Sequence, residues 1–208
     1  MPRDLPRYEG NDGSEWGLKQ WPDTARIPRH QLDPLYHGDH GQGLYGLFSI
    51  VNALRLALAH RRPFTPREID DLIDVGLRFL ELRIGLRRGV VGAVRLELWL
   101  RMAQALVEHV ARTKRVPLGL QALGRHEDRV SRADAFSMLE ATVRKRRLML
   151  MLRRGGLYTV VTGYTAYSLL LFDSGGGGWI SKRLTGVPGD SANTRHIIYP
   201  ASFLALSY

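Results

Sequence analysis

Residues 41–60 read GQGLYGLFSIVNALRLALAH, and this stretch decides the fold. A glycine-rich loop over 37–46 is followed by apolar side chains at most positions up to about His60. A helix that is apolar on nearly all of its faces is stable only when other elements cover it. The stretch therefore predicts a central buried helix over residues 46–60.

Three further helices are expected on the C-terminal side of this central helix. The sequence TPRE at 65–68 is a capping box with proline at the first helical position, and it predicts a second helix that runs to about Leu82. Glycines then predict a break before a third helix over about 92–112. Ser131 predicts the start of a fourth helix, which ends in the basic run 144–147, where cations complement the helix dipole.

The C-terminal third is rich in short apolar segments separated by glycines and turn residues. These segments predict strands over 148–152, 158–165, 167–172, 179–182 and 196–199. Helices followed by antiparallel strands make an α+β architecture, with an N-terminal helical half and a C-terminal sheet. Residues 1–36, which contain five prolines, are expected to form an extended N-terminal arm, and residues 37–208 a single domain.

The composition excludes several kinds of chemistry. The chain has 208 residues, 44% of them hydrophobic, which is enough to bury a core, and it has no cysteine. Disulfides, thiolate zinc sites, iron–sulfur clusters and a cysteine nucleophile are therefore excluded. The N-terminus is polar and the apolar runs are short, so neither a targeting segment nor a membrane span is expected. These features favour a cytoplasmic, bacterial-type protein with no cofactor.

The basic charge leaves one alternative function open. Lys and Arg number 30 against 20 Asp and Glu, which gives a formal net charge of +10. Most of the basic residues are arginines, and their pairs are scattered along the chain, as at 61–62, 87–88 and 153–154. A nucleic-acid-binding regulatory protein would gather such charge on one face. Nucleic-acid binding is therefore an alternative that the sequence does not favour.

Two short patterns are weak indications of a ligand site. Residues 41–46 match G-x-G-x-x-G, but a dinucleotide-binding loop follows a strand and the residues before Gly41 do not predict one. A Rossmann fold is therefore not expected. His30, His37, Asp39 and His40 are irregularly spaced, as in ordinary loops, so no metal site is predicted.

Two segments resemble the papain-fold cysteine peptidases, and in particular the bacterial double-glycine leader peptidases. Residues 41–54, GQGLYGLFSIVNAL, are similar to the segment in which that family places a Cys-Gly pair at the start of a long buried helix. Residues 155–174, GGLYTVVTGYTAYSLLLFDS, are similar to the hairpin that begins with the family's catalytic His and ends with an Asp or Asn. A helix N-terminus lowers the pKa of such a thiol and supplies N–H groups to an oxyanion hole.

The resemblance implies a papain-like fold in which the catalytic residues have been replaced. Tyr45 stands at the position of the Cys, Leu157 at the position of the His, and Asp173 at the position of the orienting acid. Gln42 precedes Tyr45 more closely than papain-type spacing requires, which weakens an oxyanion role for it. A phenol without a neighbouring base cannot carry out thiol-type acyl transfer, so no peptidase activity is expected.

The expected function is therefore binding of a protein or peptide segment without cleaving it, as a pseudopeptidase or regulatory module. The implied cleft runs past the three replaced or retained positions, and its candidate binding residues are Gln42, Gly43, Gly46, Ser49 and Tyr158. Ser49 has two interpretations, as a substitute nucleophile or as a helix-packing residue. An enzyme that uses the same cleft for different chemistry is a further alternative. The sequence leaves the identity of the partner and the oligomeric state open.

Overall fold

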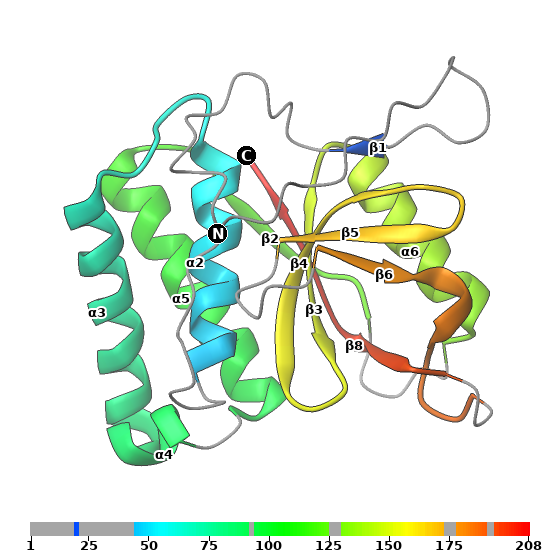
Figure 1. Ribbon diagram of the computed structural model, residues 1–208. Coiled ribbons are helices and arrows are strands. Elements are labelled where there is room, and N and C mark those ends of the chain that lie inside the picture. The colour runs from blue at the N-terminus through cyan, green and yellow to red at the C-terminus, as the bar shows by residue number, and fades with distance from the viewer. Residues whose placement is uncertain (1–18, 21–43, 92–93, 125–129, 173–177, 191–193) are drawn as a thin grey trace, which may run out of the picture.

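The computed structural model describes residues 19–20, 44–91, 94–124, 130–172, 178–190 and 194–208 (Figure 1). The described helices are α2 (Leu44–Leu58), α3 (Pro66–Ile84), α4 (Leu86–Val91), α5 (Leu96–Lys114) and α6 (Arg132–Arg144). The strands are β1 (Lys19–Gln20), β2 (Gly119–Ala122), β3 (Leu148–Arg153), β4 (Leu157–Tyr164), β5 (Ser168–Phe172), β6 (Trp179–Ser181), β7 (Thr185–Gly186) and β8 (His196–Ser207), with a 3-10 turn, η2 (Lys182–Leu184). The α+β class predicted from the sequence is confirmed.

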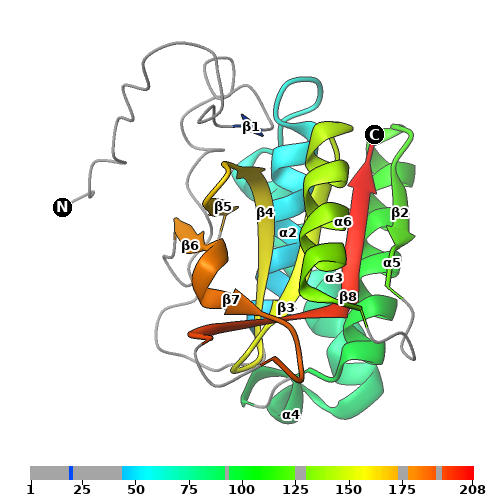
Figure 2. The same ribbon diagram turned by 90° about the vertical axis from the view of Figure 1, so that its right-hand side faces the viewer.

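The strands form a mainly antiparallel sheet in the order β2-β8-β3-β4-β5-β6. β1 pairs with the end of β4, where Lys19 faces Tyr164, and β7 pairs with β8 in parallel. Helices α2, α3 and α5 lie on one side of the sheet, and α6 lies on the other (Figures 1 and 2). The sheet is thus the middle layer of a three-layer domain.

Two cores meet at the sheet, and β3 contributes to both. Leu148 and Leu150 belong to the core with α2 and α5, whereas Met149 and Met151 belong to the core with α6. Successive strand residues point to opposite faces, so a strand that is covered on both sides needs a continuous apolar run. This requirement explains why residues 148–152 read LMLML without polar alternation.

The central helix is confirmed, and it is α2. From Gly46 to Leu58 only Phe48 is not classed as buried. Its neighbours are α3 and α5 on one side and strands β3 and β4 on the other. The capping box is also present: the hydroxyl of Thr65 accepts a hydrogen bond from the backbone N–H of Glu68 at 3.3 Å, and the carboxylate of Glu68 accepts one from the backbone N–H of Thr65 at 2.7 Å.

Several boundaries predicted from the sequence are wrong. The third helix begins at Leu96 rather than near 92, and part of the expected break before it is the short helix α4. The last strand extends to Ser207 instead of ending at Tyr199, because β8 continues past Pro200 and pairs with both β2 and β3. Strand β2 was not expected, since residues 119–122, GLQA, have little strand propensity. Pairing with β8 stabilises it there.

Two more predictions concern the chain outside the main elements. Most of the predicted N-terminal arm lies outside the described residues, as do His30, His37, Asp39 and His40. Among the described residues, no helix combines the length and the apolar composition needed to cross a lipid bilayer.

Candidate functional site

The positions selected by the peptidase resemblance lie where α2 and β4 begin. Tyr45 is in the first turn of α2 and is half-buried, and Leu157 is the first residue of β4 and is also half-buried. A Cβ atom built on Gly46 would lie 3.3 Å from Cδ2 of Tyr158, so the start of the helix and the start of the strand are in contact. Gln42, Gly43 and Asp173 lie outside the described residues.

Trp99, on α5, fills the space beside this junction. Its indole Nε1–H donates a hydrogen bond to the carbonyl oxygen of Gly46 at 3.0 Å. Its ring stacks on Tyr158, with the ring centroids 4.4 Å apart and the planes at 26°. Trp99 is fully buried and Tyr158 is 2% exposed, so these two rings line a packed core at this point and not an open cleft.

Ser49 lies one turn further along α2, and its hydroxyl is already engaged. The Oγ–H donates to the carbonyl oxygen of Gly46 at 2.8 Å, and the side chain is buried. A Ser that donates to a carbonyl three residues earlier is a common arrangement inside helices. A carbonyl oxygen does not remove a proton from a hydroxyl, so this geometry does not activate Ser49 as a nucleophile.

Tyr158 is held as a neutral phenol. Its hydroxyl donates to the carbonyl oxygen of Val94 at 2.8 Å. Burial raises the pKa of Tyr158 far above its ordinary value, and the negative charge of Glu97 raises it further. At neutral pH the phenol is therefore a hydrogen-bond donor in the core, and it supplies neither a base nor an anionic nucleophile.

Trp99 is the residue of this site that sequence reasoning missed. It begins an apolar stripe along α5 whose buried members are Trp99, Met102, Ala103, Leu106, Val107 and Val110. That spacing predicts a helix with one buried face. The spacing does not reveal which distant residue the indole contacts, and Gly46 is 53 positions away in the sequence.

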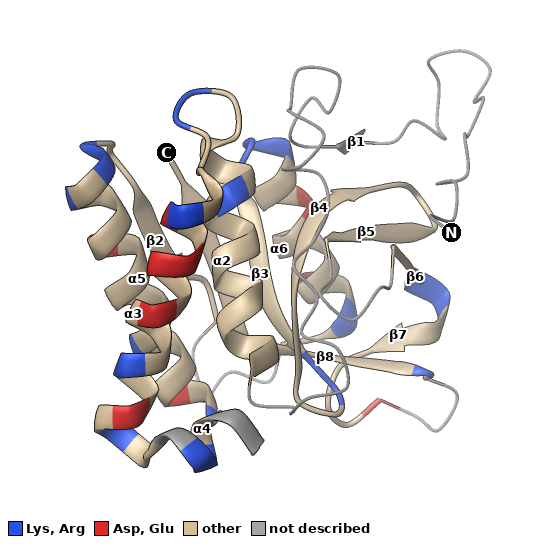
Figure 3. Ribbon diagram, turned by 60° about the vertical axis from the view of Figure 1, so that its left-hand side comes forward, with Lys and Arg blue, Asp and Glu red and all other residues tan. Residues whose placement is uncertain are grey.

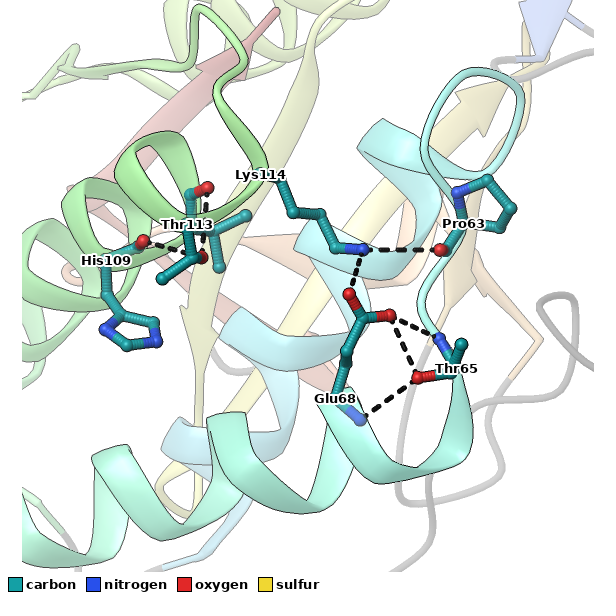
Figure 4. Close-up of polar contacts among 7 residues, drawn as sticks. Pro63, Thr65, Glu68, His109, Thr113 and Lys114 are labelled. Carbon is teal, nitrogen blue, oxygen red and sulfur yellow. Dashed lines mark hydrogen bonds and ion pairs between the residues drawn. The ribbon is translucent and has the colours of Figure 1, made fainter.

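A second polar cluster lies between the start of α3 and the end of α5 (Figure 4). The Nζ of Lys114 is 2.7 Å from the carboxylate of Glu68 and donates to the carbonyl of Pro63 at 3.3 Å, while its ammonium lies 4.4 Å from the centre of the Phe64 ring. A small hollow of about 130 Å³ beside this cluster is also lined by His109. Because Lys114 and Glu68 are paired with each other and join α5 to α3, we assign the cluster to helix docking.

The Lys114–Glu68 ion pair predicts an acid-sensitive contribution to stability. Hydrogen bonds from Lys114 and from the Thr65 backbone lower the pKa of Glu68. The contribution is therefore present above the unfolded-state pKa of Glu, about 4.3, and is lost as the pH falls through the lowered pKa. Glu68→Gln keeps the capping box and should lower the free energy of unfolding near neutral pH, measured in urea, by up to about 1 kcal/mol. The loss stays this small because the Glu68 side chain is 42% exposed and solvent screens the ion pair.

The matched control is Glu81→Gln, on the exposed side of the same helix. The Glu68→Gln variant and the wild type should converge in stability as the pH falls through the lowered pKa of Glu68, because the wild-type carboxylate then becomes protonated. An equal difference near neutral pH and below that pKa would contradict an ion-pair origin. A loss in Glu81→Gln as large as that in Glu68→Gln would contradict it as well.

Basic and acidic residues are spread over several of the described elements. Figure 3 shows Lys and Arg on several helices and on the segment after β6, with Asp and Glu between them on α3 and α5. Within the described residues, no group of three or more His, Asp or Glu side chains is arranged to hold a metal ion.

Comparison of the chain with protein-family models, with curated proteins and with solved structures finds no match.

Proposed function

We propose that this chain is a papain-like pseudopeptidase domain, which binds a protein or peptide segment without cleaving it. The observation that carries the proposal is the contact between the start of α2 and the start of β4, where the resemblance would place a nucleophile and its base. Tyr45 and Leu157 stand at those positions, and the Trp99–Tyr158 stack packs beside them. A scaffold with this layout but without the reacting groups is suited to binding.

The packing beside Gly46 bears on where a partner would bind. Ser49 and Trp99 both donate to the Gly46 carbonyl, so this carbonyl has no capacity left for a substrate backbone. The neighbouring phenol of Tyr158 is occupied by Val94. A partner is therefore expected on the outer surface of the domain and not between Gly46 and Tyr158.

Incubation with a library of internally quenched fluorescent peptides tests the loss of catalysis. We expect no turnover above that of a heat-denatured sample, because neither a thiol nor an imidazole stands at the expected positions. The matched variants are Ser49→Ala and Tyr45→Phe, each of which removes one hydroxyl from α2. Turnover that Ser49→Ala abolishes and Tyr45→Phe leaves intact would overturn the proposal.

An immobilised peptide array probed with the labelled protein tests binding. We expect retention by a subset of sequences with a weak dependence on salt. Retention on duplex DNA or heparin with a steep loss at rising salt would favour the nucleic-acid alternative, since releasing many counterions makes affinity strongly salt-dependent. That result, together with no retention on the array, would overturn peptide binding.

A further inference from the structure

A larger hollow lies on the α6 side of the sheet, away from Gly46 and Trp99. Its volume is about 580 Å³, and it is shallow and widely open to solvent. The start of α6, the turn between β4 and β5, and η2 form its walls, and we call it the α6–η2 groove. Figure 2 shows α6 and the segment after β6 on this side of the sheet.

Part of the lining of the α6–η2 groove is apolar and aromatic. Phe136 and Ala133 come from α6, and Ala166 and Tyr167 come from the turn. Tyr167 is 56% exposed, which makes it one of two large hydrophobic side chains on the described surface that are mostly in water. An exposed aromatic ring within a concave surface is suited to packing against an aromatic or aliphatic side chain.

Lys182 is a structural cation of the groove wall. Its Nζ lies 2.5 Å from the carboxylate of Glu140 and donates to the carbonyl of Thr165 at 2.6 Å. Its side chain is 13% exposed, and the ammonium lies 5.0 Å from the centre of the Tyr164 ring. These contacts neutralise and orient Lys182, so this residue joins α6 to the sheet.

Two arginines of the groove carry charge that no carboxylate of the described residues neutralises. Arg132 donates through Nη2 to the carbonyls of Lys182 at 2.6 Å and Arg183 at 3.2 Å. These bonds hold the guanidinium at the groove and leave its other N–H groups able to donate. Arg183 is exposed beside it. A guanidinium that is already held in place loses little entropy when it binds a carboxylate.

We propose that the α6–η2 groove binds an acidic peptide segment in which a Glu or Asp adjoins an aromatic or aliphatic residue. The carboxylate pairs with Arg132 and Arg183, and the apolar side chain packs on Phe136 and Tyr167. This inference rests on the proposed function and names the chemistry of the partner. It combines the two kinds of side chain that line the groove, arginines and apolar or aromatic residues.

The charges around the groove favour a peptide over a nucleic acid. Two unneutralised arginines match one or two carboxylates, whereas nucleic-acid binding generally engages several phosphates in a row. Asp134 lies exposed in the first turn of α6, where its carboxylate also accepts from Ser131 at 2.6 Å. Its negative charge lies next to Ala133 of the groove and disfavours a run of phosphates along this end of α6.

Fluorescence anisotropy with a labelled peptide that carries one Glu-Phe pair among neutral residues tests the groove. The comparison probe is the same peptide with Gln in place of Glu. We expect the Glu-Phe peptide to bind about tenfold more tightly than the Gln-Phe peptide, as one charge-assisted pair provides. Arg183→Glu should lower the affinity for the Glu-Phe peptide by at least about tenfold. Tyr167→Ala should lower the affinity for both peptides.

The matched control is Arg101→Glu, an exposed charge reversal on α5 with the same change in net charge. It should change the affinity by less than about twofold, because α5 lies on the opposite side of the sheet from α6 and salt weakens interactions between distant exposed charges. Equal weakening by Arg101→Glu and Arg183→Glu, or tighter binding of a labelled DNA duplex than of the Glu-Phe peptide, would overturn the groove assignment. Circular dichroism confirms that each variant is folded.

The outcomes separate this inference from the function on which it rests. If the peptide array retains the protein but Arg183→Glu and Tyr167→Ala leave that retention unchanged, peptide binding stands and the α6–η2 groove is excluded. If neither the array nor the Glu-Phe peptide binds, both proposals fail. If Arg183→Glu loses binding of the Glu-Phe peptide while Arg101→Glu keeps the wild-type affinity, the result supports both peptide binding and the groove assignment.

Discussion

Trp99→Ala should lower the free energy of unfolding by about 3–5 kcal/mol, the usual range when a fully buried Trp is truncated. The indole is completely buried, stacks on Tyr158 and donates to the Gly46 carbonyl. Its removal leaves a cavity among α2, α5 and β4, and it also removes one of the two side-chain hydrogen bonds to that carbonyl. Urea unfolding followed by circular dichroism measures the loss.

Trp99→Phe is the matched variant for this experiment. It keeps an aromatic ring next to Tyr158 but has no N–H to donate, so its cost should fall well below that of Trp99→Ala. Ser49 still donates to Gly46 in this variant. A loss of less than about 1 kcal/mol in Trp99→Ala would mean that the region repacks easily, contrary to the described geometry. Most domains have a free energy of unfolding of only about 5–15 kcal/mol, so the loss expected for Trp99→Ala is a large share of the total.

Gly124→Ala should also be strongly destabilising, by about 3 kcal/mol, at the upper end of overpacking costs. A Cβ atom at Gly124 would lie 2.1 Å from the carbonyl oxygen of Pro200 and 3.0 Å from Cα of Ala201. Both are backbone atoms of β8, so no side-chain rotation relieves the contact. The strand would have to move away from the segment that follows β2, where Leu123 donates to the carbonyl of Phe203.

Gly178→Ala is the control for this substitution. A Cβ atom built there has no heavy atom within 4 Å, so its effect should stay within about 0.5 kcal/mol, as for ordinary surface changes. Thermal melting followed by circular dichroism compares the two variants under identical conditions. Similar melting temperatures for Gly124→Ala and Gly178→Ala would show that β8 yields at Pro200 more readily than its pairing indicates.

Local signals in the sequence were sufficient for the central helix and for the start of α3. The apolar run of α2 needs no knowledge of its partners to indicate burial, and the capping box at Thr65 and Glu68 closes within one helical turn. What the sequence did not reveal is that the same Glu68 pairs with Lys114, 46 positions away. A local pattern predicts an element, whereas the docking of two elements depends on contacts between distant residues.

Some residues of the candidate site could likewise be predicted from the sequence, whereas others could not. The resemblance directed attention to Tyr45, Leu157 and Tyr158, and the structure places the starts of α2 and β4 in contact. It gave no indication of Trp99, which belongs to neither of the two similar segments. The α6–η2 groove could not be predicted from the sequence either. Its residues Arg132, Tyr167 and Arg183 come from three separate segments, and no regular sequence spacing relates them.

The position of β8 in the sheet has a consequence for the order of folding. β8 pairs with β2 on one side and β3 on the other, and Gly119 faces Ser207 across 88 positions of the sequence. On a ribosome, helices α2, α3 and α5 are synthesised long before residues 196–207, which form β8, leave the exit tunnel. Until then β2 has no partner among the described strands, and β3 has one exposed edge. Closure of the sheet is therefore a late, long-range step, and such steps slow folding and leave strand edges open to aggregation.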